Sequence, residues 1–355
     1  MAQEEQAQQN QEGELHFPED YFHFDKDKLI DQYTRLGSDM KAAYELGDET
    51  DIFTLKTKPD RIFFLGMGGS SISGEFLKSY LKRLNIHIPI ELVRSYDLPP
   101  TISEHSLVIA VSYSGNTEET LSTYRQAARI TKNIVGLASG GRLEEVAKMS
   151  RLPFIKVPKG YQPRTAALSY LFFPIIRVLE RLKLIGRQQA DVEHLVKHLI
   201  KPDFKTYAIA VSEKLMYSIP IIYASQDYYS VAYRFKTQIN ENAKRHAFAH
   251  SYSEFNHNEL LGYTSLDAKY SIVTFRFDDD HRRIHKRMDL VKAITNKAGV
   301  ETTEIKLSGG HFLTKLFSGI VIGDLISYYL ALRYRTDPSP VELIEDLKTK
   351  MGPVL

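Results

Sequence analysis

The sequence contains no cysteine, and neither sign of charge dominates it. Without cysteine the chain forms no disulfide, no thiolate zinc site and no cysteine nucleophile. Its 46 basic and 44 acidic residues give a net charge of +2, which provides no electrostatic footprint for nucleic acid or an anionic membrane. No apolar run approaches the roughly 20 residues of a membrane span, and the polar start, MAQEEQAQQNQEGE, lacks the apolar core of a signal peptide. These absences predict a cytoplasmic enzyme or binding protein.

The length of 355 residues favours two domains over one. A hydrophobic fraction of 43% and a charged fraction of 25% are typical of an ordinary globular protein. Residues 1–14 are rich in Gln and Glu and predict a disordered polar tail. We expect one domain over residues 15–190 and a second over 200–355, joined by the polar segment 186–202.

Short apolar runs alternate with helical segments in both halves of the chain. The expected strands are 61–65, 90–94, 107–111, 133–137, 219–224, 270–275 and 302–307. The expected helices are 25–46, 74–84, 117–131, 142–149, 166–184, 228–246, 281–298, 312–334 and one after Pro340. Such alternation indicates buried parallel strands in βαβ units. The predicted fold class is α/β, with two doubly wound domains, each a mostly parallel sheet flanked by helices, from a degenerate duplication.

Two strand-to-helix turns of the first half have the composition of an anion site. GMGGSS follows the first strand, and SYSGNT follows the strand at 107–111. Ligands of open parallel sheets bind where such turns begin helices, because free N–H groups and partial positive charge attract anions. Glycine and serine are also simply good turn formers. The surplus hydroxyls of Ser112, Ser114 and Thr117 nevertheless suggest that the second turn binds something.

A dinucleotide site fits these turns less well than a phosphate monoester does. The G-x-G-x-x-G fingerprint would need glycine where Ser71 stands, and no acidic residue closes the strand at 90–94, since Glu91 lies near its start. The nucleotide P-loop pattern G-x-x-x-x-G-K-[ST] is absent from the sequence. Hydroxyls without a lysine therefore indicate a small phosphorylated metabolite.

GMGGSS and SYSGNTEET together resemble the sugar isomerase (SIS) domain, whose S-x-S-G-x-[ST]-x-E-[ST] turn binds sugar phosphates. The resemblance implies that Ser112, Ser114 and Thr117 bind the phosphate. It also implies that Gly69 and Ser70 close over it, and that both halves are SIS-type domains. Because this fold also occurs in regulators and amidotransferases, it does not fix the function.

Four further motifs resemble the bifunctional phosphoglucose/phosphomannose isomerase family: QPRTA, INENAKRH, EFNHNELLGY and GGHFLTKLF…GDLISYYLA. The resemblance covers the chain from about residue 40 to its end. It implies reversible isomerisation between glucose 6-phosphate and fructose 6-phosphate, with mannose 6-phosphate as a further substrate, and no cofactor or metal. It also implies a homodimer in which His257 reaches the site of the neighbouring subunit.

Isomerisation moves a proton between C1 and C2 through an enediol(ate), which needs a base, groups for ring opening and a cation near the developing charge. By resemblance, Glu241 is the base and His257 takes part in ring opening. Lys315 assists the ring opening, and Arg164 stabilises the enediolate. These four residues are the candidate catalytic set.

The residue pattern alone leaves other interpretations open. Helical periodicity places Glu241 on one face with Arg234, Gln238 and Arg245, which is typical of a solvated salt-bridge face. His257 would be a loop histidine. A non-catalytic sugar-phosphate sensor and an amino-sugar phosphate isomerase are the alternative functions. The counterpart of a threonine that precedes the family's lysine is also open, between Ser308 and Thr314.

A metal site is a weaker alternative. His281 and His285 are separated by one helical turn and could share a cation. They follow the acidic run DDD and lie among basic residues, a pattern typical of a solvated helix start. We therefore expect no metal.

Overall fold

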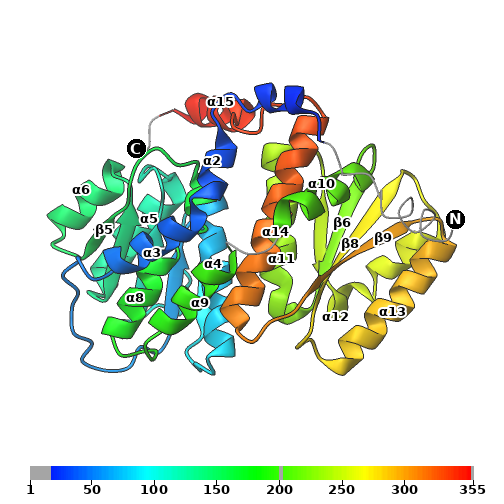
Figure 1. The fold of residues 1–355 in the computed structure, drawn as a ribbon. Helices are drawn as coiled ribbons and strands as arrows, with labels where there is room; N and C mark the ends of the chain where they lie inside the picture. The colour runs from blue at the N-terminus through cyan, green and yellow to red at the C-terminus, as the bar shows by residue number, and fades with distance from the viewer. Residues whose placement is uncertain (1–16, 200–202, 353–355) are drawn as a thin grey trace, which may run out of the picture.

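The computed structural model describes residues 17–199 and 203–352, so the predicted tail at 1–14 lies outside the described residues. The chain forms a five-stranded sheet of order β2-β1-β3-β4-β5 and a four-stranded sheet of order β7-β6-β8-β9, and every pair of neighbouring strands is parallel. Figure 1 shows the two sheets on opposite sides of a central group of helices, among them α4, α11 and α14. The predicted α/β class with two doubly wound halves is confirmed.

The first sheet is built from β1 (Ile62–Leu65), α4 (Gly68–Arg83), β2 (Ile90–Val93), β3 (Leu107–Val111), α5 (Glu118–Ile130), β4 (Ile134–Ala138), α6 (Gly141–Met149) and β5 (Phe154–Lys156). Strand β1 pairs with β2 on one side and β3 on the other. The carboxyl ends of β1 and β3 therefore form the topological switch point, where open α/β sheets bind ligands. Both candidate phosphate turns lie there, because one follows β1 and the other follows β3.

The second sheet is built from β6 (Ile219–Ala224), η2 (Gln226–Tyr228), α11 (Tyr229–Asn242), β7 (Phe248–Ser251), α12 (Tyr252–Phe255), η3 (Glu259–Thr264), β8 (Tyr270–Phe277), α13 (Arg282–Lys297), β9 (Glu301–Leu307) and α14 (Phe312–Arg333). The last helix is α15 (Glu342–Met351). Strand β6 lies between β7 and β8, so this sheet repeats the topology around β1. Its switch point is at the carboxyl ends of β6 and β8.

The remaining helices are η1 (Glu19–Phe24), α2 (Leu29–Thr34), α3 (Leu36–Leu46), α7 (Pro163–Ala166), α8 (Phe173–Arg181), α9 (Gln189–Leu199) and α10 (Phe204–Lys214). Three sequence-based expectations are wrong here. The helix expected at 25–46 is two helices, and the Asp25 carboxylate accepts hydrogen bonds from the first N–H groups of α2. The helix expected at 166–184 is interrupted before α8, and α9 occupies most of the expected polar connection at 186–202.

The two halves share one hydrophobic core. Phe76 on α4 and Phe172 both pack against Phe317 on α14, with ring centroids 5.8 and 5.4 Å apart. Helix α14 corrects the expectation that no apolar run approaches membrane length. An 18-residue window of this 22-residue helix has a mean hydropathy of 1.4, and α14 is the one helix among the described residues with the length and composition of a span. Its apolar window is entirely buried inside the protein, as expected for a core helix.

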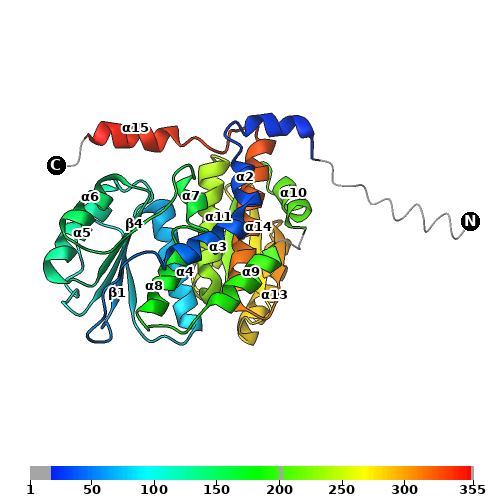
Figure 2. The ribbon, with the colours of Figure 1, turned by 60° about the vertical axis from the view of Figure 1, so that its left-hand side comes forward.

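The two halves run in opposite directions across their interface. The C-terminal end of α4 meets the start of the second switch point, where Lys82 pairs with Asp227 at 2.5 Å and Arg83 with Asp279 at 3.0 Å. The C-terminal end of α11 meets α7, where Asn242 accepts a hydrogen bond from Arg164. Figure 2 shows α7 and α15 at the same end of the molecule. The two switch points therefore lie at opposite ends of the domain interface.

Candidate active site

The hydroxyl turn after β3 is held by its own side chains. Ser112 is buried, and its Oγ accepts a hydrogen bond from the Gly115 N–H at 3.1 Å and lies 2.8 Å from Thr117 Oγ1. Gly115 has φ +72°, and a Cβ there would lie 1.8 Å from the Gly140 carbonyl oxygen, so only glycine fits. Thr117 precedes α5 without capping it through its side chain. Its hydroxyl and the exposed Ser114 hydroxyl remain at the helix start, where an anion is stabilised.

The glycine turn after β1 forms the first turn of α4, which begins at Gly68 and not at the expected residue 74. Ser70 Oγ accepts a hydrogen bond from the Tyr113 N–H at 3.1 Å, so the two turns are joined. A Cβ on Gly69 would lie 3.1 Å from the Arg164 nitrogen. Glycine at this position therefore lets the backbone of α7 pack directly against the candidate phosphate site.

Arg164 on α7 is buried, with an exposed fraction of 1%, and its Nε and Nη2 donors are engaged. Nε donates to Asn242 Oδ1 at 2.8 Å, and Nη2 donates to the carbonyls of Pro338 and Ser339 at 2.7 and 3.1 Å. Burial lowers the pKa of Arg164, and the charge of Glu241 opposes this shift. The planar donor set fixes a cation beside the glycine turn.

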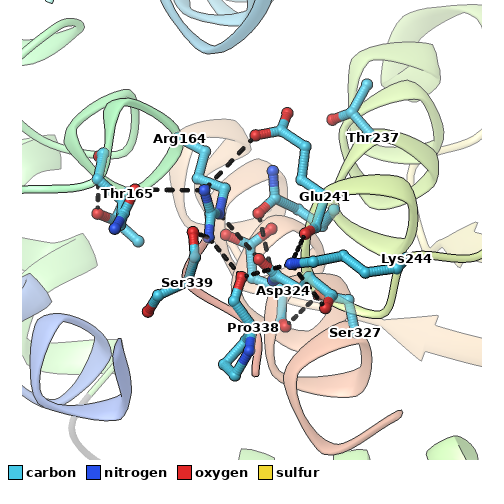
Figure 3. Close-up of polar contacts among 12 residues, drawn as sticks. Arg164, Thr165, Thr237, Glu241, Lys244, Asp324, Ser327, Pro338 and Ser339 are labelled. Atoms are coloured by element: carbon cyan, nitrogen blue, oxygen red, sulfur yellow. Dashed lines mark hydrogen bonds and ion pairs between the residues drawn. The ribbon is translucent and has the colours of Figure 1, made fainter. Parts of the chain in front are cut away.

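Glu241 extends from the last turn of α11 toward this cation. Its Oε2 lies 3.7 Å from Arg164 Nη1, and 26% of its side chain is exposed. Figure 3 shows the carboxylate and the guanidinium facing each other across α7 and α11. Asn242 next to it is buried and donates to Ser327 Oγ at 2.9 Å, which anchors the end of α11 to α14. An accessible carboxylate can act as a base, and a fixed cation beside it can stabilise the anion that proton removal creates.

The face of α11 below Glu241 is not solvated, contrary to the prediction from periodicity. Arg234 and Gln238 have exposed fractions of 1% and 0%. Arg234 forms a bidentate ion pair with Asp324 of α14, with distances of 3.0 and 2.6 Å, and donates to the Arg164 carbonyl at 2.7 Å. The first domain covers this face, so the polar residues pack between the halves. Arg234 thereby supports Arg164 through its backbone carbonyl.

Lys244 is a site residue that the sequence analysis did not identify. Its Nζ donates to the carbonyls of Glu241 at 2.6 Å and Pro338 at 3.1 Å. Figure 3 shows it on the same side of the site as Pro338. The INENAKRH motif contains this lysine, but a cation just after a helix is usually an exposed charge, so periodicity gave no signal.

Lys315 lies at the other end of the interface. It is buried at the start of α14, and its Nζ is 2.8 Å from both Asp278 and Asp279. Ser327, which contacts Asn242, is about 18 Å further along α14, at a rise of about 1.5 Å per residue. The structure therefore does not bring Lys315 together with Glu241 within one chain. Of the two hydroxyls near it, Thr314 is buried and lies 2.9 Å from His194.

His257 is exposed on the turn that follows α12. This turn follows the carboxyl end of β7, whereas Glu241 lies near the opposite edge of the second sheet. One chain therefore does not bring His257 to Glu241. The histidines of the metal alternative have other partners, since His281 Nδ1 accepts from the Arg283 N–H and His285 Nδ1 from Arg276 Nε. The described residues contain no group of three or more metal-ligating side chains.

Solved structures show the same fold. The C-terminal domain of glucosamine-fructose-6-phosphate aminotransferase from Francisella tularensis superimposes with a TM-score of 0.72 at 16% identity, covering 88% of this chain and 98% of that chain. Sequence families divide the chain where the two sheets do. Residues 56–150 match the SIS domain, and residues 204–351 match the bacterial phospho-glucose isomerase C-terminal SIS domain.

Relatives extend the match to the whole chain. A bifunctional phosphoglucose/phosphomannose isomerase of Caldicellulosiruptor bescii is 35% identical over 339 residues, which covers 92% of this chain and 99% of that protein. One of Thermoplasma acidophilum is 37% identical over 82% of this chain and 89% of its own length. A D-glucosamine-6-phosphate 4-epimerase of Sulfolobus acidocaldarius is 35% identical over 63% of this chain and 71% of its length. Because relatives of this identity match most of its length, the chain belongs to the bifunctional phosphoglucose/phosphomannose isomerase family.

Proposed function

We propose that this protein interconverts glucose 6-phosphate and fructose 6-phosphate, and likewise mannose 6-phosphate, by proton transfer between C1 and C2. The observation that carries this proposal is the position of Glu241, 3.7 Å from the buried Arg164 guanidinium. Arg164 in turn packs against the glycine of the phosphate turn. A sugar phosphate whose phosphate is bound at the turns can thus place its C1 and C2 beside Glu241.

The hydroxyls of Ser114 and Thr117 donate to the phosphate, with Ser112 holding Thr117 in place. The starts of α4 and α5, with Gly69 and Ser70, add backbone N–H groups and partial positive charge. The phosphate thereby anchors the far end of the substrate. Anchoring a non-reacting group provides binding energy that orients the reacting carbons.

The Glu241 carboxylate removes the proton from C2 of the open-chain aldose. The C2–H electron pair forms the C1–C2 double bond, and the electrons of the carbonyl move to O1. The Arg164 guanidinium stabilises the resulting negative charge. Glu241 then returns its proton to C1, while a proton moves between O2 and O1, which gives the ketose. Every step moves a proton or shifts an electron pair within the substrate, so the reaction needs no oxidant or reductant.

Ring opening needs an acid and a base near the ring oxygen, and we assign His257 to it from the partner subunit of a homodimer. His257 is exposed on the second half and distant from the Glu241 of its own chain, as a group that serves a neighbour would be. Mixing inactive Glu241→Gln with inactive His257→Ala tests this assignment. Random mixed dimers with C2 symmetry restore about a quarter of the sites. No recovery after subunit exchange would contradict it.

Two other functions make different demands on the same site. A sugar-phosphate sensor needs the phosphate turns but not Glu241. The similarity to the D-glucosamine-6-phosphate 4-epimerase favours an amino sugar as the second candidate substrate, but it covers less of the chain than the isomerase match. A cytoplasmic location stays a prediction from composition.

The decisive experiment is isotope exchange. Purified protein is incubated in deuterated water with glucose, mannose, fructose or glucosamine 6-phosphate, and proton NMR follows C1 and C2. We expect deuterium at C2 of the aldoses and at C1 of fructose 6-phosphate, together with product formation. Binding without exchange would identify a sensor, and reaction of glucosamine 6-phosphate alone would identify an amino-sugar enzyme.

A further inference from the structure

The end of α11 is joined to the segment after α14 by one lysine. Lys244 Nζ donates to the carbonyls of Glu241 at 2.6 Å, Asn242 at 3.4 Å and Pro338 at 3.1 Å. The first two carbonyls belong to the last turn of α11, where carbonyls lack partners within the helix. An ammonium has three donors, so these carbonyls use all of them.

The Pro338 carbonyl is shared between two cations. It accepts from Arg164 Nη2 at 2.7 Å as well as from Lys244 Nζ at 3.1 Å. The segment after α14 therefore contacts the guanidinium of the first half and the ammonium of the second at one oxygen. Figure 3 shows this arrangement, with the Pro338 carbonyl between the two side chains and Glu241 above them.

We propose that Lys244 is a positioning residue of the isomerase site, which ties the helix end carrying Glu241 to the segment that holds Arg164. The proposal rests on the proposed function. Lys244 itself does not touch the reacting carbons. It fixes the separation of the base and the cation, and such geometry is a major source of rate when both act on one substrate.

The backbone at Lys244 turns away from the end of α11, as it does at Lys183 and Arg335 after α8 and α14. Its φ is +54°, in the left-handed region that side chains other than those of glycine, asparagine and aspartate rarely adopt. Glycine is the usual residue at this position after a helix. This conformation directs the Lys244 side chain back toward the carbonyls at the end of α11.

The charge of Lys244 depends on pH in the range where enzymes work. The Lys244 side chain as a whole is exposed, but partial burial of its ammonium and the neighbouring Arg164 charge lower its pKa to about 8, while Asp337, Glu241 and Glu342 oppose the shift. These groups face it from α7, from α11 and from the chain at and before α15. Above this pH the neutral amine holds the carbonyls less strongly, so we expect kcat to fall.

Stability should change in the opposite direction. A lysine whose pKa is lower in the folded protein than in the unfolded chain binds fewer protons when folded over the interval between the two values. Its contribution to the free energy of unfolding therefore rises with pH from about 8 upward. If kcat falls with rising pH while the contribution to stability rises, the loss of turnover comes from misplaced catalytic groups and not from unfolding.

The test compares Lys244→Met, Lys244→Arg and the control Lys297→Met. Methionine keeps the stem and the same backbone conformation but removes the ammonium. Lys297 is an exposed lysine at the last position of α13, in the same half of the chain. Fructose 6-phosphate turnover is measured from pH 6 to about 9.5, on either side of the pKa of about 8, and amide hydrogen exchange is followed over residues 239–244.

We expect Lys244→Met to lower kcat by about 10- to 100-fold, as a small misplacement of catalytic groups does. KM should stay within about twofold, because phosphate binding is untouched. The alkaline fall of kcat should disappear in Lys244→Met and persist in Lys297→Met, and Lys244→Arg should recover part of kcat. Exchange over 239–244 should become faster in Lys244→Met alone.

An unchanged kcat in Lys244→Met, or an alkaline fall that persists in it, would overturn the proposal. A change confined to KM would make Lys244 a substrate contact. If wild-type protein isomerises no sugar phosphate, the proposed function fails and hydrogen exchange decides alone. Faster exchange would then support the tie between the helix end and Pro338, and unchanged exchange would reject it.

Discussion

Strands β3 and β8 occupy equivalent places in the two sheets. The turns that follow these two strands have opposite chemistry. The turn after β3 contains hydroxyls and glycine and leads into α5. The turn after β8 contains Asp278, Asp279 and Asp280 and leads into α13. Lys315 is buried against the first two of these carboxylates, and Arg83 of the other half pairs with Asp279.

In both sheets the carboxyl ends of the strands lead into helix starts, whose backbone N–H groups favour an anion. In the first sheet the turns at 66–71 and 112–117 contain no carboxylate side chain, which suits the phosphate site that we propose there. In the second sheet the chain supplies its own carboxylates and the cations that neutralise them. The same topology therefore provides one candidate ligand site and one internal ion-pair cluster, and the difference comes from the turn residues and not from the fold.

The largest effect should come from Glu241→Gln. Glutamine keeps the shape and much of the hydrogen bonding but takes up no proton at neutral pH, and a positioned base contributes roughly 10²–10⁴-fold to the rate. We expect turnover and C2 deuterium exchange to be lost together, while fructose 6-phosphate still binds in calorimetry. The control is Glu45→Gln, which changes an exposed carboxylate on α3. Should Glu241→Gln keep most of its activity, Glu254 and Glu259 would be the next candidates for the base.

The turn after β3 can be compared with the turn after β6 by removing hydroxyls from each. Ser114→Ala with Thr117→Val removes two donors, and each lost hydrogen bond to a charged group costs about 1.5–3 kcal/mol. KM for fructose 6-phosphate should rise strongly, while thermal unfolding stays close to wild type. Ser225→Ala removes a hydroxyl at the second switch point and should leave KM unchanged. Equal KM values for all three proteins would show that the phosphate binds elsewhere.

Much of the strand pattern could be predicted from sequence, because short buried runs alternate with helices. The strand at 219–224 matches β6, and both phosphate turns lie at the expected switch point. Strands β5 and β7 were not predicted, because they are partly exposed and polar residues such as Lys156 and His250 interrupt the apolar run. Helix α9 was missed because its polar surface is typical of a connection.

Long-range packing could not be predicted from one helix at a time. The polar face with Arg234 and Gln238 is typical of a solvated helix, but here a second domain covers it. Lys315 and Glu241 were expected in one site, and the opposite directions of the two halves separate them within the chain. The sequence does not encode that direction in any local pattern.

Lys315→Met tests whether the ion pairs in the turn after β8 contribute to stability and not to the reaction. Removing the buried cation leaves Asp278 and Asp279 without their partner, and because both are partly exposed we expect a loss of about 1–3 kcal/mol in the free energy of unfolding. Urea unfolding measures this loss, and kcat per folded molecule should stay near wild type. Lys292→Met, which removes a partly exposed cation from Glu304, is the control. Wild-type stability with lost turnover would instead assign Lys315 to the reaction, in a neighbouring subunit's site.

The smallest effect concerns how the free energy of unfolding contributed by the turn after β8 changes at acid pH. Burial would raise the pKa of Asp278, but the hydrogen bonds from Lys315 and the Gly309 N–H outweigh it, so the pKa is lowered. A carboxylate with a lowered pKa contributes stability above its unfolded value, about 3.9, and loses it as the pH falls through the folded value. The difference in unfolding free energy between wild type and Asp278→Asn should thus shrink as the pH falls below about 4. In the Lys315→Met background this pH dependence should weaken, because its main favourable partner is gone. A pH-independent difference in both backgrounds would mean that Asp278 is held by its backbone contacts and not by the buried lysine.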